Sequence, residues 1–328
     1  MLGGIIRRFQ KRKRYNCITF PTHESYQTGL ATTNTDFYMW HGEGIKKWED
    51  KYRPLPSNHF RLNGDGFNQI PIDIDFDFIL SQNKAGQFPV AIQLSNMLQI
   101  PVVSIEHCLP MPWWTAHDKR YWQQTADINL FISEYSKKEW GYEGEVVHHG
   151  IDTDKFSDFG EQRNRHILSV VNDWINRGQI LGFDIWKRVT ANLPVAVLGD
   201  TPGLSFPAQS VEHLVMNYNR AQIFLNTSIV SPIPTSLLEA MSCGAACVST
   251  NNCMIPEIIE NGVNGFLTND EGEMRYYLEL LLKDNELARK IGREARITIQ
   301  ERFGLDKFVS RWNEIFDRAA NMFVKELR

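Results

Sequence analysis

The sequence predicts an α/β protein of two doubly wound units, each a parallel sheet covered by helices. Its 328 residues exceed what one hydrophobic core usually organises, so two domains of about 150 residues are expected. Short apolar runs bounded by turn residues alternate with longer segments of helical period. Runs such as VAVLG at 195–199 are apolar throughout, which favours strands buried on both faces of a parallel sheet.

The apolar runs place the strands, and the periodic segments between them place the helices. The polar segment 152–165 has the composition of a linker. It divides the chain into domains at 1–155 and 156–304, followed by an amphipathic helix at 305–328 that is expected to pack back on the first domain. Strands are predicted at 16–20, 36–40, 76–81, 101–106, 130–133, 146–149, 167–171, 195–199, 223–227, 246–250 and 265–268, and helices at 86–98, 179–191, 211–218, 235–243, 256–261 and 270–286.

Composition excludes several classes of protein. The chain has 35 basic and 39 acidic side chains, and its net charge of −4 argues against a basic footprint over the whole surface. Five cysteines without a CxxC pair indicate reduced thiols in a cytoplasmic protein rather than a disulfide framework or a zinc site. No apolar run approaches the length of a membrane-spanning helix. Residues 1–150 hold most of the histidine and tryptophan, so this half is richer in groups that titrate, stack or donate.

The segment 231–270 is the most informative stretch for chemistry. It predicts a proline-stiffened loop, a helix that Thr235 or Ser236 can cap, and a buried strand. A helix N-terminus carries roughly half a positive charge and suits a phosphate. Glu239, expected within the first turn, could accept hydrogen bonds from a ribose diol. An ordinary loop, helix and strand with Glu239 as a dipole partner is the alternative.

These residues resemble a known family. SLLEAMSCGAACVST followed by PEIIENGVNGFL is similar to the nucleotide-sugar motif of family 4 glycosyltransferases. That family has the GT-B fold, two Rossmann-like domains that face a central cleft. ADINLFISE at 126–134, VVHHGIDTDKF at 146–156, HILSVVNDWINRG at 166–178 and VAVLGD at 195–200 are similar to other family segments, in the same order.

The resemblance implies transfer of a sugar, with retention, from a nucleotide-diphosphate donor to a hydroxyl acceptor. A UDP-sugar is the favoured donor, and neither a cofactor nor a metal is expected. Glu239 falls on the glutamate that holds the ribose. Ser231 falls where the family has a second glutamate, and a serine cannot stabilise positive charge as a carboxylate can.

The resemblance also places the diphosphate. In the phosphate loop Asn172 replaces the usual arginine, which leaves Arg177 as the cation that binds the diphosphate. Gly178 would let the backbone approach closely. The remaining donor contacts are expected from the loop and helix start, at Pro232, Ile233, Pro234, Thr235, Ser236 and Leu237.

His107 follows the strand 101–106 and matches a family histidine that lines the donor-sugar pocket. The alternative is a strand-end histidine satisfied by a neighbouring carbonyl. Alternation along the strand turns Glu106 to the other face.

The acceptor site is predicted around the loop after the first strand. Thr22, His23, Glu24 and Tyr26 could bind an acceptor hydroxyl, with His23 or Glu24 as base; the alternative is a helix start capped by Thr22. Trp113 and Trp114 could stack on a sugar or base, or serve as packing anchors.

Two patterns suggest metal sites but are given little weight. Asp73, Asp75 and Asp77 form overlapping Asp-x-Asp pairs that could hold Mg²⁺, or could be a solvated strand edge. His148 and His149 are adjacent, and neighbouring strand residues face opposite ways.

The segment from Arg7 to Arg14 sets basic residues beside Leu2, Ile5 and Phe9 at helical spacing. It suits the inner face of a membrane or a DNA backbone, or it is a solvated helix. A glycan or lipid-linked glycan acceptor is favoured, and a hydroxylated DNA base, the substrate of some phage enzymes, is the alternative. A nucleotide-sugar-binding protein without turnover and a nucleotide-sugar epimerase are further alternatives, and the oligomeric state is open.

Overall fold

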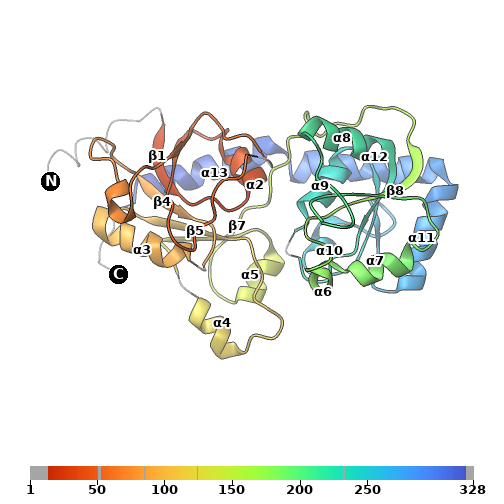
Figure 1. Cartoon of the computed structure of the whole chain (residues 1–328), viewed down its shortest axis with the longest axis horizontal. Helices are drawn as coiled ribbons and strands as arrows, with labels where there is room; N and C mark the ends of the chain where they lie inside the picture. Colours follow the sequence, from red (N-terminus) through yellow and green to blue (C-terminus); the bar gives the residue numbers. More distant parts are fainter. Residues whose placement is uncertain (1–13, 51–52, 85, 124, 232, 323–328) are drawn as a thin grey trace. The chain divides into compact units, whose positions relative to one another are not determined.

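The chain forms two compact units in the computed structural model (Figure 1). The structure describes residues 14–322 except 51–52, 85, 124 and 232. Unit 1 comprises the residues up to Gly150 together with those from Asp306 onward, and unit 2 comprises Ile151–Leu305. The predicted linker 152–165 lies at the start of unit 2, and its last two residues already belong to a strand.

The described residues of unit 1 form a seven-stranded sheet in which every neighbouring pair is parallel. The strand order is β3-β2-β1-β4-β5-β6-β7, so the winding direction reverses between β1 and β4. Ligands of such sheets bind where the order reverses, at the carboxyl ends of the strands. The strands are β1 (Tyr15–Thr19), β2 (Thr35–Met39), β3 (His59–Arg61), β4 (Phe78–Ser81), β5 (Val102–Glu106), β6 (Ile128–Phe131) and β7 (Glu145–Val146).

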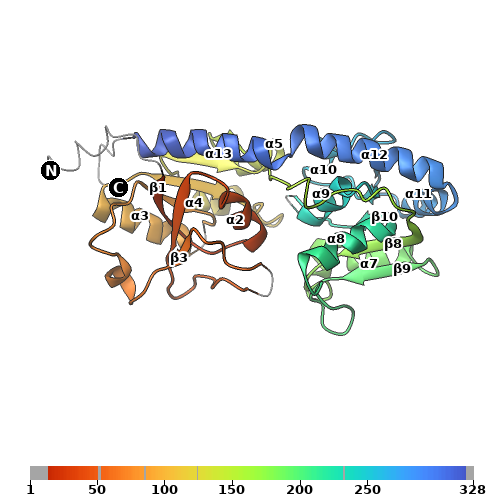
Figure 2. The same cartoon turned by 90° about the horizontal axis from the view of Figure 1, so that it is seen from above.

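The last helix of the chain packs on the sheet of unit 1 (Figure 2). Trp312 donates from Nε1 to the Tyr26 hydroxyl at 3.1 Å, and the Phe316 ring stacks on Phe78 with centroids 4.8 Å apart. Phe308, Trp312, Ile315, Phe316 and Ala319 of this helix are buried, which anchors the helix on the unit. The helices of this unit are α2 (Glu24–Leu30), η1 (Gly66–Gln69), α3 (Gln87–Leu98), α4 (Ala116–Trp122), α5 (Glu134–Trp140) and α13 (Leu305–Ala320).

Unit 2 contains a second parallel sheet, of five strands in the order β12-β11-β10-β8-β9. The winding reverses between β8 and β10, so the loops that follow these two strands flank the expected ligand crevice. The VAVLG segment forms an edge strand with Val195 40% exposed, so the prediction that it is buried on both faces was wrong. The strands are β8 (Asn164–Val170), β9 (Val195–Leu198), β10 (Ala221–Asn226), β11 (Ala246–Ser249) and β12 (Phe266–Leu267).

Two predicted helices of unit 2 are divided. The segment 179–191 breaks at Gly182, whose φ of +68° suits glycine, and the segment 270–286 ends where Asp284 caps the next helix by accepting from Leu287 N. No helix of the described residues is long and apolar enough to cross a bilayer. The helices are α6 (Gly178–Leu181), α7 (Phe183–Val189), α8 (Val211–Arg220), α9 (Thr235–Ser242), α10 (Ile255–Ile258), α11 (Glu271–Lys283) and α12 (Asn285–Arg302).

Candidate functional site

The start of α9 is a helix N-terminus without a side-chain cap. Pro234 takes the N-cap position with extended backbone angles, and no side chain caps the helix. The prediction that Thr235 or Ser236 caps it was therefore wrong, because both already lie inside the helix. Their N–H groups have no acceptor among the described residues, so this helix end offers two amides and its dipole to an anion.

Arg177 lies on the neighbouring loop, at the N-cap position of α6. Its side chain is exposed and has no partner in the described part of the chain. The N–H groups of Ile229 and Val230 both donate to Ile180 O, at 2.8 and 3.0 Å. These bonds tie the loop after β10 to α6, so the loops that carry Arg177 and the start of α9 are held together.

Asn172 links the loop after β8 to the segment after β9 by accepting from Asp200 N at 2.8 Å. Gly178 opens α6 outside the left-handed region, and a Cβ there would approach Phe183 Cβ at 3.3 Å. Close packing instead falls on Gly182, where a Cβ would lie 1.8 Å from Thr227 O.

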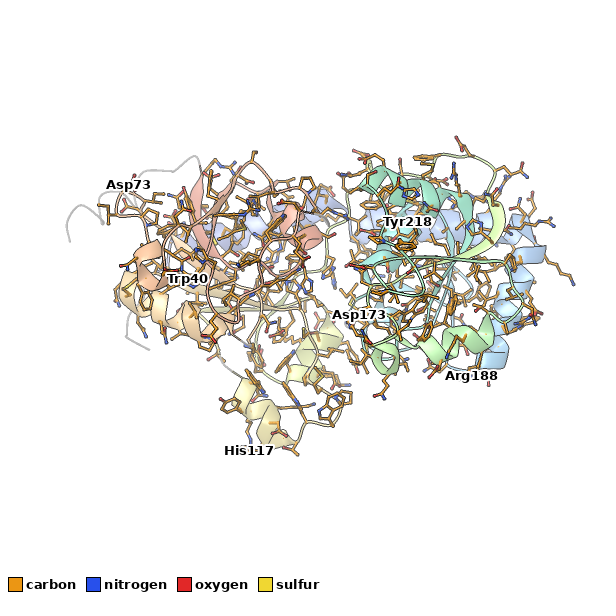
Figure 3. All side chains as sticks on the ribbon, viewed as in Figure 1. Trp40, Asp73, His117, Asp173, Arg188 and Tyr218 are labelled. Carbon is orange, nitrogen blue, oxygen red and sulfur yellow. The ribbon has the colours of Figure 1, made fainter. Side chains whose placement is uncertain are left out.

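Glu239 is the fifth residue of α9, in its second turn rather than its first. Its carboxylate is buried and accepts from the Tyr218 hydroxyl at 2.9 Å. Tyr218, labelled in Figure 3, lies in the interior of unit 2. Sequence reasoning missed this tyrosine, because it lies on the buried face of another helix, 21 residues earlier in the chain. Ser231 and Ile233 lie in the loop before α9, and Pro232 falls outside the described residues.

His107 follows β5 and is buried at the carboxyl edge of the unit 1 sheet. Its ring lies edge-on to those of His23 and Tyr26, with centroids 5.0 and 4.5 Å away. Nε2 lies 3.4 Å from Gln82 Oε1, and Nδ1 is buried without a partner among the described residues. Burial lowers the pKa of His107 well below its usual value, so the ring is neutral. The neighbour of the ring nitrogen Nε2 is thus the side-chain carbonyl oxygen of Gln82, as the alternative from the sequence allows, whereas Nδ1 has no partner among the described residues.

Glu106, the residue before this histidine, and Lys84 are both buried at the same edge of the sheet. The Glu106 carboxylate accepts from Cys108 N at 3.1 Å and from Lys84 N at 3.3 Å, and so joins the loops after β4 and β5. Burial raises the pKa of Glu106 and lowers that of Lys84. Sequence reasoning set Glu106 aside and missed Lys84, although both are polar residues at strand ends of the expected ligand edge.

The loop after β1 differs from the predicted acceptor site. Thr22 does not cap α2, because its hydroxyl donates to Phe20 O and accepts from Gln87. Glu24 is buried and paired with Lys46 at 2.7 Å, so its carboxylate is already engaged. Tyr26 is buried too and does not reach the surface. Of these residues, His23 is exposed.

Solved structures resemble most of the chain. The structure of Anabaena Alr3699/HepE in complex with UDP matches with a TM-score of 0.73 and 15% identity, over 93% of this chain and 100% of that one. The same protein has also been solved with UDP-glucose. The fold is GT-B. Both Rossmann-like sheets of this GT-B chain thus have the strand orders that place ligands at the loops described above.

Sequence matches are confined to part of the GT-B chain. Residues 205–298 match the family described as Glycosyl transferases group 1. N-acetyl-alpha-D-glucosaminyl L-malate synthase of Bacillus anthracis is 40% identical over 82 residues, 24% of this chain and 22% of that protein. An uncharacterized glycosyltransferase of Methanocaldococcus jannaschii is 33% identical over 91 residues, 27% and 23% of the two chains. The chain thus aligns with less than a quarter of the length of these relatives.

The two tryptophans predicted for the acceptor differ in environment. Trp113 is 70% exposed, whereas Trp114 stacks on Trp122 with centroids 5.9 Å apart. Trp114 is therefore a packing anchor in this GT-B chain, and Trp113 alone presents a ring to solvent.

The patterns that suggested metal or nucleic acid have other partners where they are described. Asp77 accepts from Asn16 N at 2.8 Å, and His148 Nδ1 lies 3.2 Å from Ile132 O. No three His, Cys, Asp or Glu side chains of the described residues converge in a way that could hold a metal ion. Arg14 pairs with Asp36 at 2.7 Å, and the rest of the basic segment from Arg7 lies outside the described residues.

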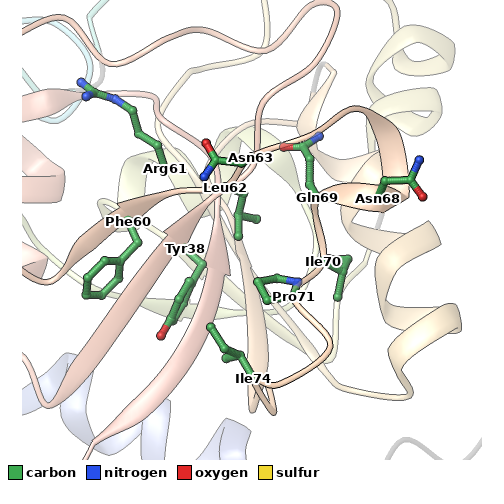
Figure 4. A pocket seen from close by; sticks show the side chains of 10 residues that line it. All are labelled: Tyr38, Phe60, Arg61, Leu62, Asn63, Asn68, Gln69, Ile70, Pro71 and Ile74. Carbon is green, nitrogen blue, oxygen red and sulfur yellow. The ribbon is translucent and has the colours of Figure 1, made fainter.

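A groove of about 390 Å³ lies over the β2–β3 edge of unit 1 (Figure 4). None of the predicted site residues lines it. Its lining residues are Tyr38, Phe60, Arg61, Leu62, Asn63, Asn68, Gln69, Ile70, Pro71 and Ile74.

Proposed function

We propose that this chain is a retaining, metal-independent family 4 glycosyltransferase. It would transfer a sugar from a UDP-sugar to a hydroxyl of a glycan or lipid-linked glycan, in the cytoplasm or at the inner membrane face. The observation that carries the proposal is the uncapped start of α9 beside Arg177, at the point where the unit 2 sheet reverses its winding. The structural neighbour bound to UDP and UDP-glucose supports the choice of donor.

In this function the α9 amides and Arg177 bind the diphosphate, and Glu239 holds the ribose. The bond between the sugar and the diphosphate breaks as the acceptor oxygen attacks, and the leaving diphosphate takes the acceptor proton. Amides and a guanidinium aimed at the leaving group stabilise the negative charge that develops there. Because Ser231 cannot supply a carboxylate to the sugar, catalysis depends strongly on this stabilisation.

A nucleotide-sugar-binding protein without turnover is the second candidate. It is favoured by Ser231 in place of a carboxylate and by Asn172, whose side-chain oxygen already accepts from Asp200 N. Release of UDP with a panel of glycan acceptors separates the two candidates, since only the enzyme turns over.

Donor binding is tested by thermal shift with UDP-, GDP- and ADP-glucose. A ligand at 100 times its dissociation constant raises the free energy of unfolding by about 2.7 kcal/mol. We expect UDP-glucose to raise the midpoint and uridine, which lacks the diphosphate, to leave it unchanged. If no nucleotide sugar shifts the midpoint, the donor site is assigned wrongly.

Arg177→Ala is expected to weaken UDP binding about 10- to 100-fold, the worth of a charge-assisted, bidentate contact. Titration calorimetry measures the change. Arg188→Ala is the matched control, because Arg188 is an exposed arginine of the same unit that pairs with Glu271 at 2.7 Å. Equal weakening in both variants would show a general charge effect rather than a phosphate contact.

A further inference from the structure

A row of hydrogen-bonded side chains crosses the interior of unit 1 and ends at His107. It runs from Asn58 through His59 to Gln27 of α2, and then to Gln82, which follows β4. His59, Gln27, Gln82 and His107 are all buried. A side-chain amide can be flipped, and a neutral imidazole has two tautomers. The donor and acceptor of each hydrogen bond in the row are therefore defined only if one end of the row fixes them.

The Asn58 end fixes the direction. Asn58 Nδ2 donates to Ala31 O at 3.0 Å and to Thr35 O at 2.8 Å, so its side-chain oxygen is the atom that faces His59. That oxygen lies 3.1 Å from His59 Nδ1, which must therefore carry the proton. Burial lowers the pKa of His59 to about 4, so the ring is neutral and its Nε2 is an acceptor.

The orientation of His59 in turn fixes the donor and acceptor atoms of Gln27 and Gln82. Gln27 Nε2 donates to His59 Nε2 at 2.9 Å, which leaves Gln27 Oε1 to accept from Gln82 Nε2 at 2.5 Å. Gln82 Nε2 also lies 3.4 Å from Phe20 O, an atom that can only accept, so its orientation has independent support. Gln82 Oε1 consequently faces His107 Nε2, at 3.4 Å.

The surroundings of His107 agree with this result. A proton on Nδ1 would be buried without an acceptor, and the bare Nε2 would then face the oxygen of Gln82. With the proton on Nε2, there is neither a buried N–H without an acceptor nor a bare nitrogen that faces an oxygen. The edge-on rings of His23 and Tyr26 hold the imidazole in place.

We propose that Asn58, His59, Gln27 and Gln82 are positioning residues that hold His107 as its Nε2–H tautomer, so that the bare Nδ1 is the acceptor for a hydroxyl group of a ligand. The role of the hydroxyl rests on the proposed function, whereas the tautomer does not. The bare, buried Nδ1 is the unfilled acceptor that such a hydroxyl would satisfy.

The tautomer is measured by ¹⁵N NMR on the full chain labelled at histidine, with the His107 signals assigned by their loss in His107→Asn. We expect Nε2 to be protonated and Nδ1 bare in the wild type. Gln82→Met is expected to give a mixture of tautomers and to lower kcat/KM about tenfold, the size of one lost hydrogen bond. Gln69→Met is the matched control, since Gln69 is a buried amide of the same unit that bonds to the backbone of His41.

The proposal that the row of side chains sets the tautomer is wrong if wild-type His107 is protonated at Nδ1. It is also wrong if His107 keeps the wild-type tautomer in Gln82→Met. Saturation with UDP-glucose is expected to move the Nδ1 resonance. If UDP-glucose raises the unfolding midpoint but leaves this resonance unmoved, the hydroxyl contact is wrong. If UDP-glucose does not bind at all, the proposed function fails. The ligand-free spectra still test whether the row of side chains sets the His107 tautomer.

Discussion

Glu239→Ala is expected to lower kcat/KM for a UDP-sugar by at least about 100-fold. The variant loses charge-assisted hydrogen bonds to the ribose, each worth about 1.5–3 kcal/mol. It also leaves the buried Tyr218 hydroxyl without the acceptor seen at 2.9 Å, which costs about 1–3 kcal/mol of stability. Steady-state kinetics and urea denaturation measure the two effects separately.

Two matched variants separate the role of Glu239 in ribose binding from its role in stabilising the fold. Glu239→Gln keeps the side-chain volume and an oxygen for Tyr218, so it should retain most of the stability and still lose about tenfold in kcat/KM. Tyr218→Phe keeps the carboxylate and should change kcat/KM much less than Glu239→Ala. If Glu239→Gln has wild-type kinetics while Tyr218→Phe is inactive, Glu239 serves the fold and does not hold the ribose.

The strands could be predicted because their signal is local. Every residue of β4, β5, β10 and β11 is buried, which is why these segments read as short apolar runs. β3 was missed because it has three residues and exposes two of them, so neither alternation nor an apolar run marks it. The break at Gly182 could not be predicted either, since its cause is contact with Thr227, 45 residues away.

The site residues that could be predicted are likewise those marked by a local sequence motif, and the ones that were missed depend on partners far away in the sequence. Arg177 and Glu239 were found because each stands within a short motif. The helix caps were misplaced because Pro234 and His23 take the N-cap positions, which backbone angles decide and residue preference only suggests. Tyr218 was missed because its role depends on a partner on another helix.

Sequence reasoning gave Gln82 no role, although it follows a buried strand at the edge where the winding reverses. Its function became visible only through partners on α2 and after β5. Position at a strand end is a usable signal for such residues, whereas the direction of their hydrogen bonds requires coordinates.

Gly182→Ala is expected to destabilise unit 2 by more than about 3 kcal/mol, since the added Cβ would lie 1.8 Å from Thr227 O and φ is +68°. The change should also weaken UDP-sugar binding, because the same turn ties α6 to the loop after β10 through Ile180 O. Urea denaturation followed by the fluorescence of the buried Trp174 measures the stability. Gly203→Ala is the matched control: its φ is +82°, but nothing lies within 4 Å of the added Cβ, so it reports the backbone cost alone, about 1–2 kcal/mol. Equal losses of stability in the two variants would mean that Thr227 moves to make room for the added Cβ. Close packing at Gly182 would then not be what holds the loop after β10.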